Sequence, residues 1–230
     1  MSGTREPDRR SPERTVSLLE AGERVKMVVF GDSITAGFAV RKGFDAFWLS
    51  MLKEKYPKAQ VAIINEGACG ATSFDGLARL DWSVIAHNPD LVTVNFGIND
   101  MYMGVRLGEF KSNLIEIVER ILAGSGSGAG PEVLLMSSEP LTTPRFDRMV
   151  LSYYQILEDV AEEMGVGFVD VYGAWMGRVA EGVPLESLIL PGLDHPNELG
   201  YKVIAEELMR FLSGEDGGFR ADRTSCVPSQ

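Results

Sequence analysis

The sequence contains few of the side chains that build metal centres and covalent cross-links. Cys69 and Cys226 are the only cysteines, and His87 and His195 the only histidines, among 230 residues. Two cysteines so far apart form neither a CxxC metal pair nor a disulfide framework. Two histidines likewise do not favour a histidine-based zinc site. We therefore expect no metal site.

The sequence also lacks long apolar segments and an excess of positive charge. No window reaches the roughly 20 apolar residues of a membrane-spanning helix. The first 26 residues are polar and contain no apolar core of a secretory signal. The net charge of -11 argues against binding to nucleic acid or to anionic membranes. We expect a cytoplasmic protein with neither kind of partner.

The length and composition suit one α/β domain, with 45% hydrophobic and 24% charged residues. Residues 1–23 are polar, and we expect them to form a disordered or loosely attached N-terminal extension. Residues 24–213 should form a single domain, and residues 214–230 a flexible C-terminal tail.

Strand-like and helix-like patterns alternate five times along this domain. This alternation predicts a three-layer α/β/α sandwich around a five-stranded parallel sheet, in the flavodoxin-like order 2-1-3-4-5. Ligands bind beyond the carboxyl ends of such strands, where the order reverses, here between the first and third strands. The expected strands are Val25–Phe30, Val61–Asn65, Leu91–Gly97, Glu132–Ser138 and Val166–Tyr172.

A serine follows the first expected strand directly, in the segment VVFGDSITAGF, from Val28 to Phe38. The segment does not fit the phosphate-binding pattern GxxxxGK[ST], the dinucleotide pattern GxGxxG or the nucleophile elbow GxSxG. Taken alone, Ser33 is more typical of a helix N-cap or a turn. We interpret its neighbour Asp32 as a residue that accepts backbone N–H groups and shapes the turn.

Three further polar features follow other elements of the sheet. NEGACGAT contains Gly70, FGIND contains Asn99, and LPGLDHPNELGY contains His195. Each is ordinary alone, as a turn glycine, a capping asparagine or a surface histidine. Together they could perform acyl transfer, with Ser33 as nucleophile and His195 as base. The N–H groups of Ser33 and Gly70, with the Asn99 side chain, could then hold the oxyanion.

At these residues the sequence resembles the SGNH hydrolase superfamily, also called GDSL esterases and lipases. Four family blocks occur in order, as GDSIT, NEGACGAT, GIND and HPN, and the resemblance covers roughly residues 25–211. It implies a three-layer α/β/α fold with five parallel strands, no cofactor, and hydrolysis of an ester or thioester. It also implies that Ser33 is the nucleophile, His195 the base, and Gly70 and Asn99 oxyanion donors.

One position departs from the family pattern. The family usually places its triad aspartate three residues before the histidine, where this chain has Gly192. We expect Asp194 to orient His195 instead, as the third catalytic residue; otherwise a backbone carbonyl could do so and leave a Ser-His dyad, or the site could be impaired. The last possibility leaves a second hypothesis, a ligand-binding domain that keeps the fold without turnover.

The apolar residues after the first and third strands suggest the substrate site. Phe38, Met101 and Tyr102 are candidates for a partly apolar acyl pocket, although packing against neighbouring loops explains them equally well. No long insertion suggests a lid, which disfavours an interfacial lipase. We therefore expect short-chain acyl or acetyl esters as substrates.

Overall fold

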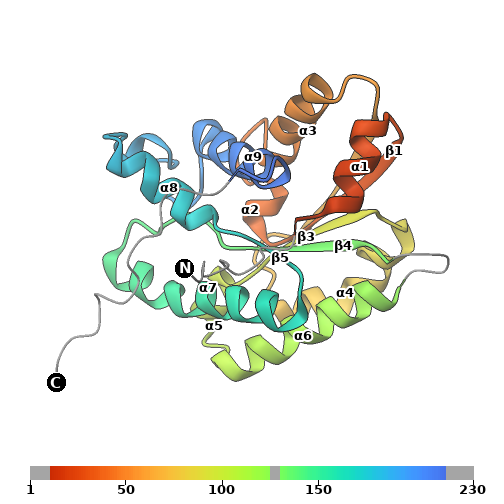
Figure 1. The fold of residues 1–230 in the computed structure, drawn as a ribbon. Helices are drawn as coiled ribbons and strands as arrows, with labels where there is room; N and C mark the ends of the chain where they lie inside the picture. The colour runs from red at the N-terminus through yellow and green to blue at the C-terminus, as the bar shows by residue number, and fades with distance from the viewer. Residues whose placement is uncertain (1–10, 125–129, 216–230) are drawn as a thin grey trace, which may run out of the picture.

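The protein folds around a five-stranded parallel sheet in a computed structural model, which describes residues 11–124 and 130–215 (Figure 1). The strand order is β2-β1-β3-β4-β5, which confirms the predicted order 2-1-3-4-5. The strands are β1 (Arg24–Gly31), β2 (Gln60–Gly67), β3 (Leu91–Asn95), β4 (Glu132–Met136) and β5 (Gly167–Val169).

Helices cover both faces of this sheet and complete the expected three layers (Figure 1). Helices α1, α3 and α9 lie on one face, and α4, α6 and α7 on the other. The helices are α1 (Glu13–Ala21), α2 (Ser33–Ala36), α3 (Phe44–Lys55), α4 (Ser73–Ser83), α5 (Ile98–Met103), α6 (Leu107–Ala123), α7 (Pro144–Met164), α8 (Val171–Ala180) and α9 (Glu198–Leu212).

The central strands are apolar on both faces because helices cover both sides. Residues 27–30 of β1 are fully buried, and every residue of β3 is buried. Two-sided burial explains why these strands appear in the sequence as continuous apolar runs rather than as alternating ones. The switch between β1 and β3 lies in the middle of this buried sheet. It fixes the carboxyl ends that carry Ser33 and Asn99.

The prediction that residues 1–23 form a disordered or loosely attached extension is wrong for its second half. Helix α1 packs against the domain with Leu19 only 1% exposed, and the left-handed Gly22 ends the helix. The backbone N–H groups of Arg14 and Thr15 donate to the Glu132 carboxylate at 3.1 and 2.7 Å. This carboxylate at the start of β4 satisfies N–H groups that have no partner within the helix. Residues 1–10 and 216–230, which carry the rest of the expected extension and most of the expected tail, lie outside the described residues.

The last strand is shorter than expected, because Val171 and Tyr172 belong to helix α8. Asp170 caps this helix, and its carboxylate accepts the N–H of Gly173 at 3.0 Å. An aspartate cap favours helix over strand for the residues that follow it. In the described part of the chain, no helix is long and apolar enough to cross a membrane.

A close approach between β2 and α2 fixes the turn that carries Ser33. A Cβ on Gly67 would lie 2.1 Å from the backbone nitrogen of Ala36 in α2. We expect Gly67→Ala to lower the free energy of unfolding by about 3 kcal/mol, since backbone must shift to admit the methyl group. Chemical denaturation would measure this change. Gly108→Ala is the control, because Gly108 is exposed on α6 with open space around it, and a fall no larger than the control's would contradict the prediction.

Candidate active site

Ser33 occupies the first position of α2, immediately beyond β1. Asp32 caps this short helix, with its Oδ1 accepting the N–H of Ile34 at 2.9 Å. This contact confirms the interpretation of Asp32 as a residue that shapes the turn. Burial raises the pKa of Asp32 to about 7, partly offset by the backbone hydrogen bond from Ile34. The cap places the Ser33 hydroxyl at the carboxyl edge of the sheet.

His195 approaches Ser33 from the loop before α9. The Ser33 Oγ lies 2.9 Å from His195 Nε2, a hydrogen-bond distance between residues 162 positions apart in the sequence. The Asn197 side chain caps α9 by accepting the N–H groups of Leu199 and Gly200 at 2.9 and 3.2 Å. The HPN block therefore begins a helix and directs the imidazole at the serine.

The surroundings of His195 keep its ring uncharged near neutral pH. Partial burial lowers the pKa of His195 below its usual 6.5, and the nearby Asp194 charge raises it in part. The Phe38 ring lies against the imidazole, with the ring centroids 4.9 Å apart. A neutral imidazole with its proton on Nδ1 presents a lone pair on Nε2 to the serine hydroxyl. Such an arrangement can accept the proton of a nucleophilic serine.

Asn99 lies at the start of α5, beyond β3, beside both neighbouring loops. Its Nδ2 donates to the backbone oxygen of Ala71 at 3.1 Å and lies 3.5 Å from Asp32 Oδ2. These contacts join the segments that follow β1, β2 and β3. Gly70 lies in the second of these segments with a φ of +77°, a left-handed conformation that glycine adopts readily. The oxyanion roles of Ser33, Gly70 and Asn99 stay predictions.

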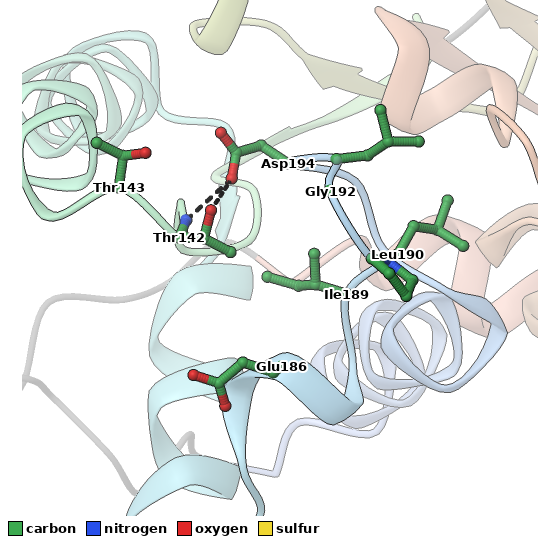
Figure 2. Close-up of a pocket in the computed structure, with 9 residues that line it drawn as sticks. Thr142, Thr143, Glu186, Ile189, Leu190, Gly192 and Asp194 are labelled. Atoms are coloured by element: carbon green, nitrogen blue, oxygen red, sulfur yellow. Dashed lines mark hydrogen bonds between the residues drawn. The ribbon is translucent and has the colours of Figure 1, made fainter.

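The expected contact between Asp194 and the imidazole is absent, so this part of the prediction is wrong. Asp194 Oδ1 accepts the backbone N–H of Thr142 at 3.0 Å and also the Thr142 hydroxyl, whereas Oδ2 accepts the Tyr102 hydroxyl at 3.3 Å. Figure 2 shows the carboxylate directed at Thr142. Residues 193–195 form a bend, in which the Asp194 side chain faces Thr142 while the His195 side chain faces Ser33.

Gly192 stands in a tight turn of the same loop. The N–H of Leu193 donates to Leu190 O at 3.1 Å, and the N–H of Leu190 donates to His195 O at 2.8 Å. Gly192 has a φ of +75° in this turn. The backbone conformation favours glycine at the position where the family usually has its aspartate. The departure from the family pattern is thus accommodated by the local backbone.

The three expected substrate-binding residues have different surroundings. Phe38 is 40% exposed beside His195, and Tyr102 is 44% exposed with its hydroxyl on Asp194. Both border the Ser33–His195 pair or its loop, as a pocket wall would. Met101 is only 4% exposed and belongs to the hydrophobic core. The structure places Met101 in the packing of α5 against the domain rather than on an open surface.

A cavity of about 330 Å³ lies beside the His195 loop (Figure 2). It has apolar and polar walls and includes Asp194, the residue before His195. Within the described residues, no cluster of three histidine, cysteine or acidic side chains could hold a metal ion. The cavity is lined by Thr142, Thr143, Glu186, Ile189, Leu190, Pro191, Gly192, Leu193 and Asp194.

Two buried acidic residues near the site were not found by sequence reasoning. Asp100 accepts the N–H and the hydroxyl of Ser73 at 3.0 and 2.6 Å. These hydrogen bonds connect the start of α4 to the segment that carries Asn99. Glu139 is fully buried just beyond β4. The available signal was an acidic residue closely following an apolar strand. Chemistry was expected after the first three strands and before the last helix, but not after the fourth strand.

The fold and the Ser33–His195 pair together define a hydrolase of the SGNH class. Residues 29–203 match the model of the GDSL-like lipase/acylhydrolase family, and the chain belongs to this family. It is 26% identical to an acetylxylan esterase of Geobacillus stearothermophilus, over 86% of this chain and 98% of that one. It is 31% identical to an arylesterase of Vibrio mimicus, over 61% of this chain and 68% of the relative.

Solved structures agree with this assignment. The crystal structure of Axe2, an acetylxylan esterase from Geobacillus stearothermophilus, superposes with a TM-score of 0.71 and 25% identity, over 85% of this chain and 95% of that chain. Three structures of Axe2 are described as catalytic mutants, with a serine, an aspartate or a histidine replaced by alanine. In Axe2 that aspartate lies three positions before the histidine, the spacing at which this chain has Gly192.

Proposed function

We propose that this esterase hydrolyses short-chain acyl or acetyl esters through an acyl-enzyme on Ser33. The observation that carries the proposal is the 2.9 Å contact between Ser33 Oγ and His195 Nε2 at the sheet's switch point. A hydroxyl held on a neutral imidazole is the arrangement that activates a serine nucleophile. The acetylxylan esterase and arylesterase relatives support ester hydrolysis as the reaction.

The proposed reaction has two halves that use the same groups. Ser33 Oγ forms a bond to the acyl carbon while its proton passes to His195 Nε2. The N–H groups of Ser33 and Gly70 and the Asn99 amide donate to the oxyanion, and His195 then protonates the departing alcohol. In the second half, water forms a bond to the acyl carbon while its proton passes to His195; the bond to Ser33 Oγ then breaks, and His195 returns the proton to Ser33 as the acid leaves. The first half thus ends with the acyl group bonded to Ser33, and the second with the acid released. His195 is neutral at the end of both.

The surroundings of the serine favour a small acyl group. Of the residues expected to line an acyl pocket, Phe38 lies against His195 and Met101 is buried in the core. Little apolar surface therefore remains accessible to an acyl chain beside the serine. The cavity beside the His195 loop is a candidate for the alcohol half of the substrate, since it combines apolar walls with Thr142 and Thr143. The proposed substrate is therefore a short acyl group on a larger alcohol.

Covalent labelling tests the proposed function directly. We expect a fluorophosphonate probe to form a stoichiometric adduct on Ser33, mapped by mass spectrometry, and the adduct to be absent from His195→Ala. A series of nitrophenyl esters should show the highest kcat/KM for acetyl and the next longer acyl groups. A folded protein that binds esters but neither labels nor turns over would support the ligand-binding hypothesis, which Gly192 motivates, and contradict this proposal.

A further inference from the structure

One ring nitrogen of the proposed base has no partner. His195 Nε2 contacts Ser33, but the buried Nδ1 has no hydrogen-bond partner among the described residues. A serine hydrolase needs a proton on Nδ1, held by an acceptor, so that Nε2 is free to take the serine proton. A buried N–H without an acceptor also destabilises the folded state. The base therefore requires an acceptor that neither Asp194 nor Gly192 supplies.

Glu139 follows a strand at the carboxyl edge of the sheet, the edge that also carries Ser33 and Asn99, and it is our candidate for that acceptor. It follows β4, the neighbour of β3, by three residues, and is 0% exposed. Its Oε2 accepts the Ser138 hydroxyl at 2.6 Å, while its buried Oε1 has no partner within the described chain. One buried acceptor and one buried donor are thus both unsatisfied in this region. Few such groups remain unpaired in native proteins without a functional reason.

Glu139 belongs to the loop that contacts the segment of the base, because Thr142, three residues further on, donates its backbone N–H to Asp194 at 3.0 Å. The Glu139 carboxyl group interacts with the carboxyl groups of Asp32 and Asp194, the residues immediately before Ser33 and His195. The loops that carry the nucleophile and the base therefore both lie within electrostatic range of Glu139. The tyrosine hydroxyls that also interact with it come from α5, α7 and α9, and belong to Tyr102, Tyr154 and Tyr201.

We propose that Glu139 is the positioning residue for His195, and that its carboxylate accepts the Nδ1–H through one bridging water. This inference rests on the proposed esterase function. It assigns to a residue after β4 the role that the family's aspartate has in the loop before α9. During attack the serine proton moves to Nε2, the Nδ1 proton stays on the ring, and the Glu139 carboxylate stabilises the imidazolium.

The burial of Glu139 gives the proposal a distinctive pH dependence. Desolvation raises the pKa of Glu139 to about 8, with smaller contributions from Asp32 and Asp194. His195 is already neutral at this pH, because its pKa lies below 6.5. The carboxylate that accepts the Nδ1–H therefore forms only as the pH rises through about 8. kcat/KM should therefore increase near pH 8, in addition to the increase at lower pH that follows deprotonation of His195.

The same shift affects stability in the opposite direction. Glu139 holds its proton in the folded state up to about pH 8, whereas an unfolded glutamic acid has a pKa of about 4.5. Between these values unfolding releases a proton, so the contribution of this residue to stability falls as pH rises. Glutamine carries no such charge. We expect Glu139→Gln to gain stability relative to the wild type at alkaline pH while it loses activity.

The decisive experiment compares pH profiles of three variants on a nitrophenyl acetate. We expect Glu139→Gln to lower kcat/KM at high pH by about 10- to 100-fold and to remove the increase near pH 8, and Glu139→Asp to retain part of both. Glu207→Gln is the matched control, since Glu207 is also nearly buried but pairs with Arg210 on α9. Its profile should equal that of the wild type.

A second measurement follows a proton of the wild-type protein, so that its pH dependence does not require a folded Glu139 variant. The Nδ1 proton of His195, assigned by its loss in His195→Ala, should give a downfield NMR signal that shifts with a pKa of about 8. A Glu139→Gln variant with the wild-type rate and pH profile would overturn the role of Glu139 while Ser33 still labels. A wild type whose Ser33 does not label would instead overturn the proposed function, and the role of Glu139 with it.

Discussion

Replacing Ser33 with alanine should lower kcat/KM for short-chain esters by about 10⁴-fold or more, because no other group can form the acyl-enzyme. The side chain is only partly buried, and its one described side-chain contact is with His195. We therefore expect the free energy of unfolding to change by less than about 0.5 kcal/mol. Steady-state kinetics on nitrophenyl acetate and chemical denaturation measure the two quantities on one preparation.

The control for this substitution is Ser112→Ala. Ser112 is exposed on α6, and its hydroxyl donates to the backbone oxygen of Gly108 at 3.0 Å. This variant should keep the wild-type kcat/KM and stability. Turnover that survives Ser33→Ala at more than about a tenth of the wild-type rate would contradict Ser33 as the nucleophile, whatever the remaining contacts of His195.

The central strands of the sheet were predictable because they are buried on both faces and therefore appear as short apolar runs. Segments such as Val25–Phe30 needed no information from distant residues. Helix α1 did not have this property, because its attachment depends on Glu132, more than 100 positions away. A polar segment stabilised by a distant carboxylate has no local signal. The same limit explains why residues 1–23 were expected to be an unattached extension.

The contact between Ser33 and His195 was predictable because each residue is placed by a local signal. Asp32 caps α2 and Asn197 caps α9, and both caps are visible in the sequence as short polar blocks at element ends. The direction of Asp194 was not predictable in this way. It depends on a turn closed by the Leu190 N–H and on Thr142, which comes from another loop.

Glu139 differs from these residues because its importance depends on burial and on the lack of a partner. In the sequence it is a glutamate in SSEP, which ordinary loop composition explains. Only the folded chain reveals a carboxyl group that is 0% exposed, with one oxygen that has no hydrogen-bond partner among the described residues. A buried carboxyl group that lowers stability as pH rises is a candidate functional residue, because ordinary packing gives no reason to keep it.

Replacing Asn99 with alanine should lower kcat by about 10²- to 10³-fold, the usual cost of removing one oxyanion donor. Asn99 Nδ2 has two hydrogens. One donates to Ala71 O at 3.1 Å and thereby fixes the amide, and the 3.5 Å separation from Asp32 Oδ2 is a long contact that leaves the other available. Because the oxyanion exists only during the reaction, kcat should fall much more than KM changes.

Asn99→Asp separates the loss of a donor from the loss of packing. The aspartate has nearly the same shape, but its carboxylate cannot donate and would repel both the oxyanion and Asp32. We expect kcat for this variant to be at least as low as for Asn99→Ala, and fluorophosphonate labelling of Ser33 to slow in proportion in both. Equal labelling rates in the wild type and the two variants would place Asn99 outside the oxyanion site and leave the donors to the backbone N–H groups of Ser33 and Gly70.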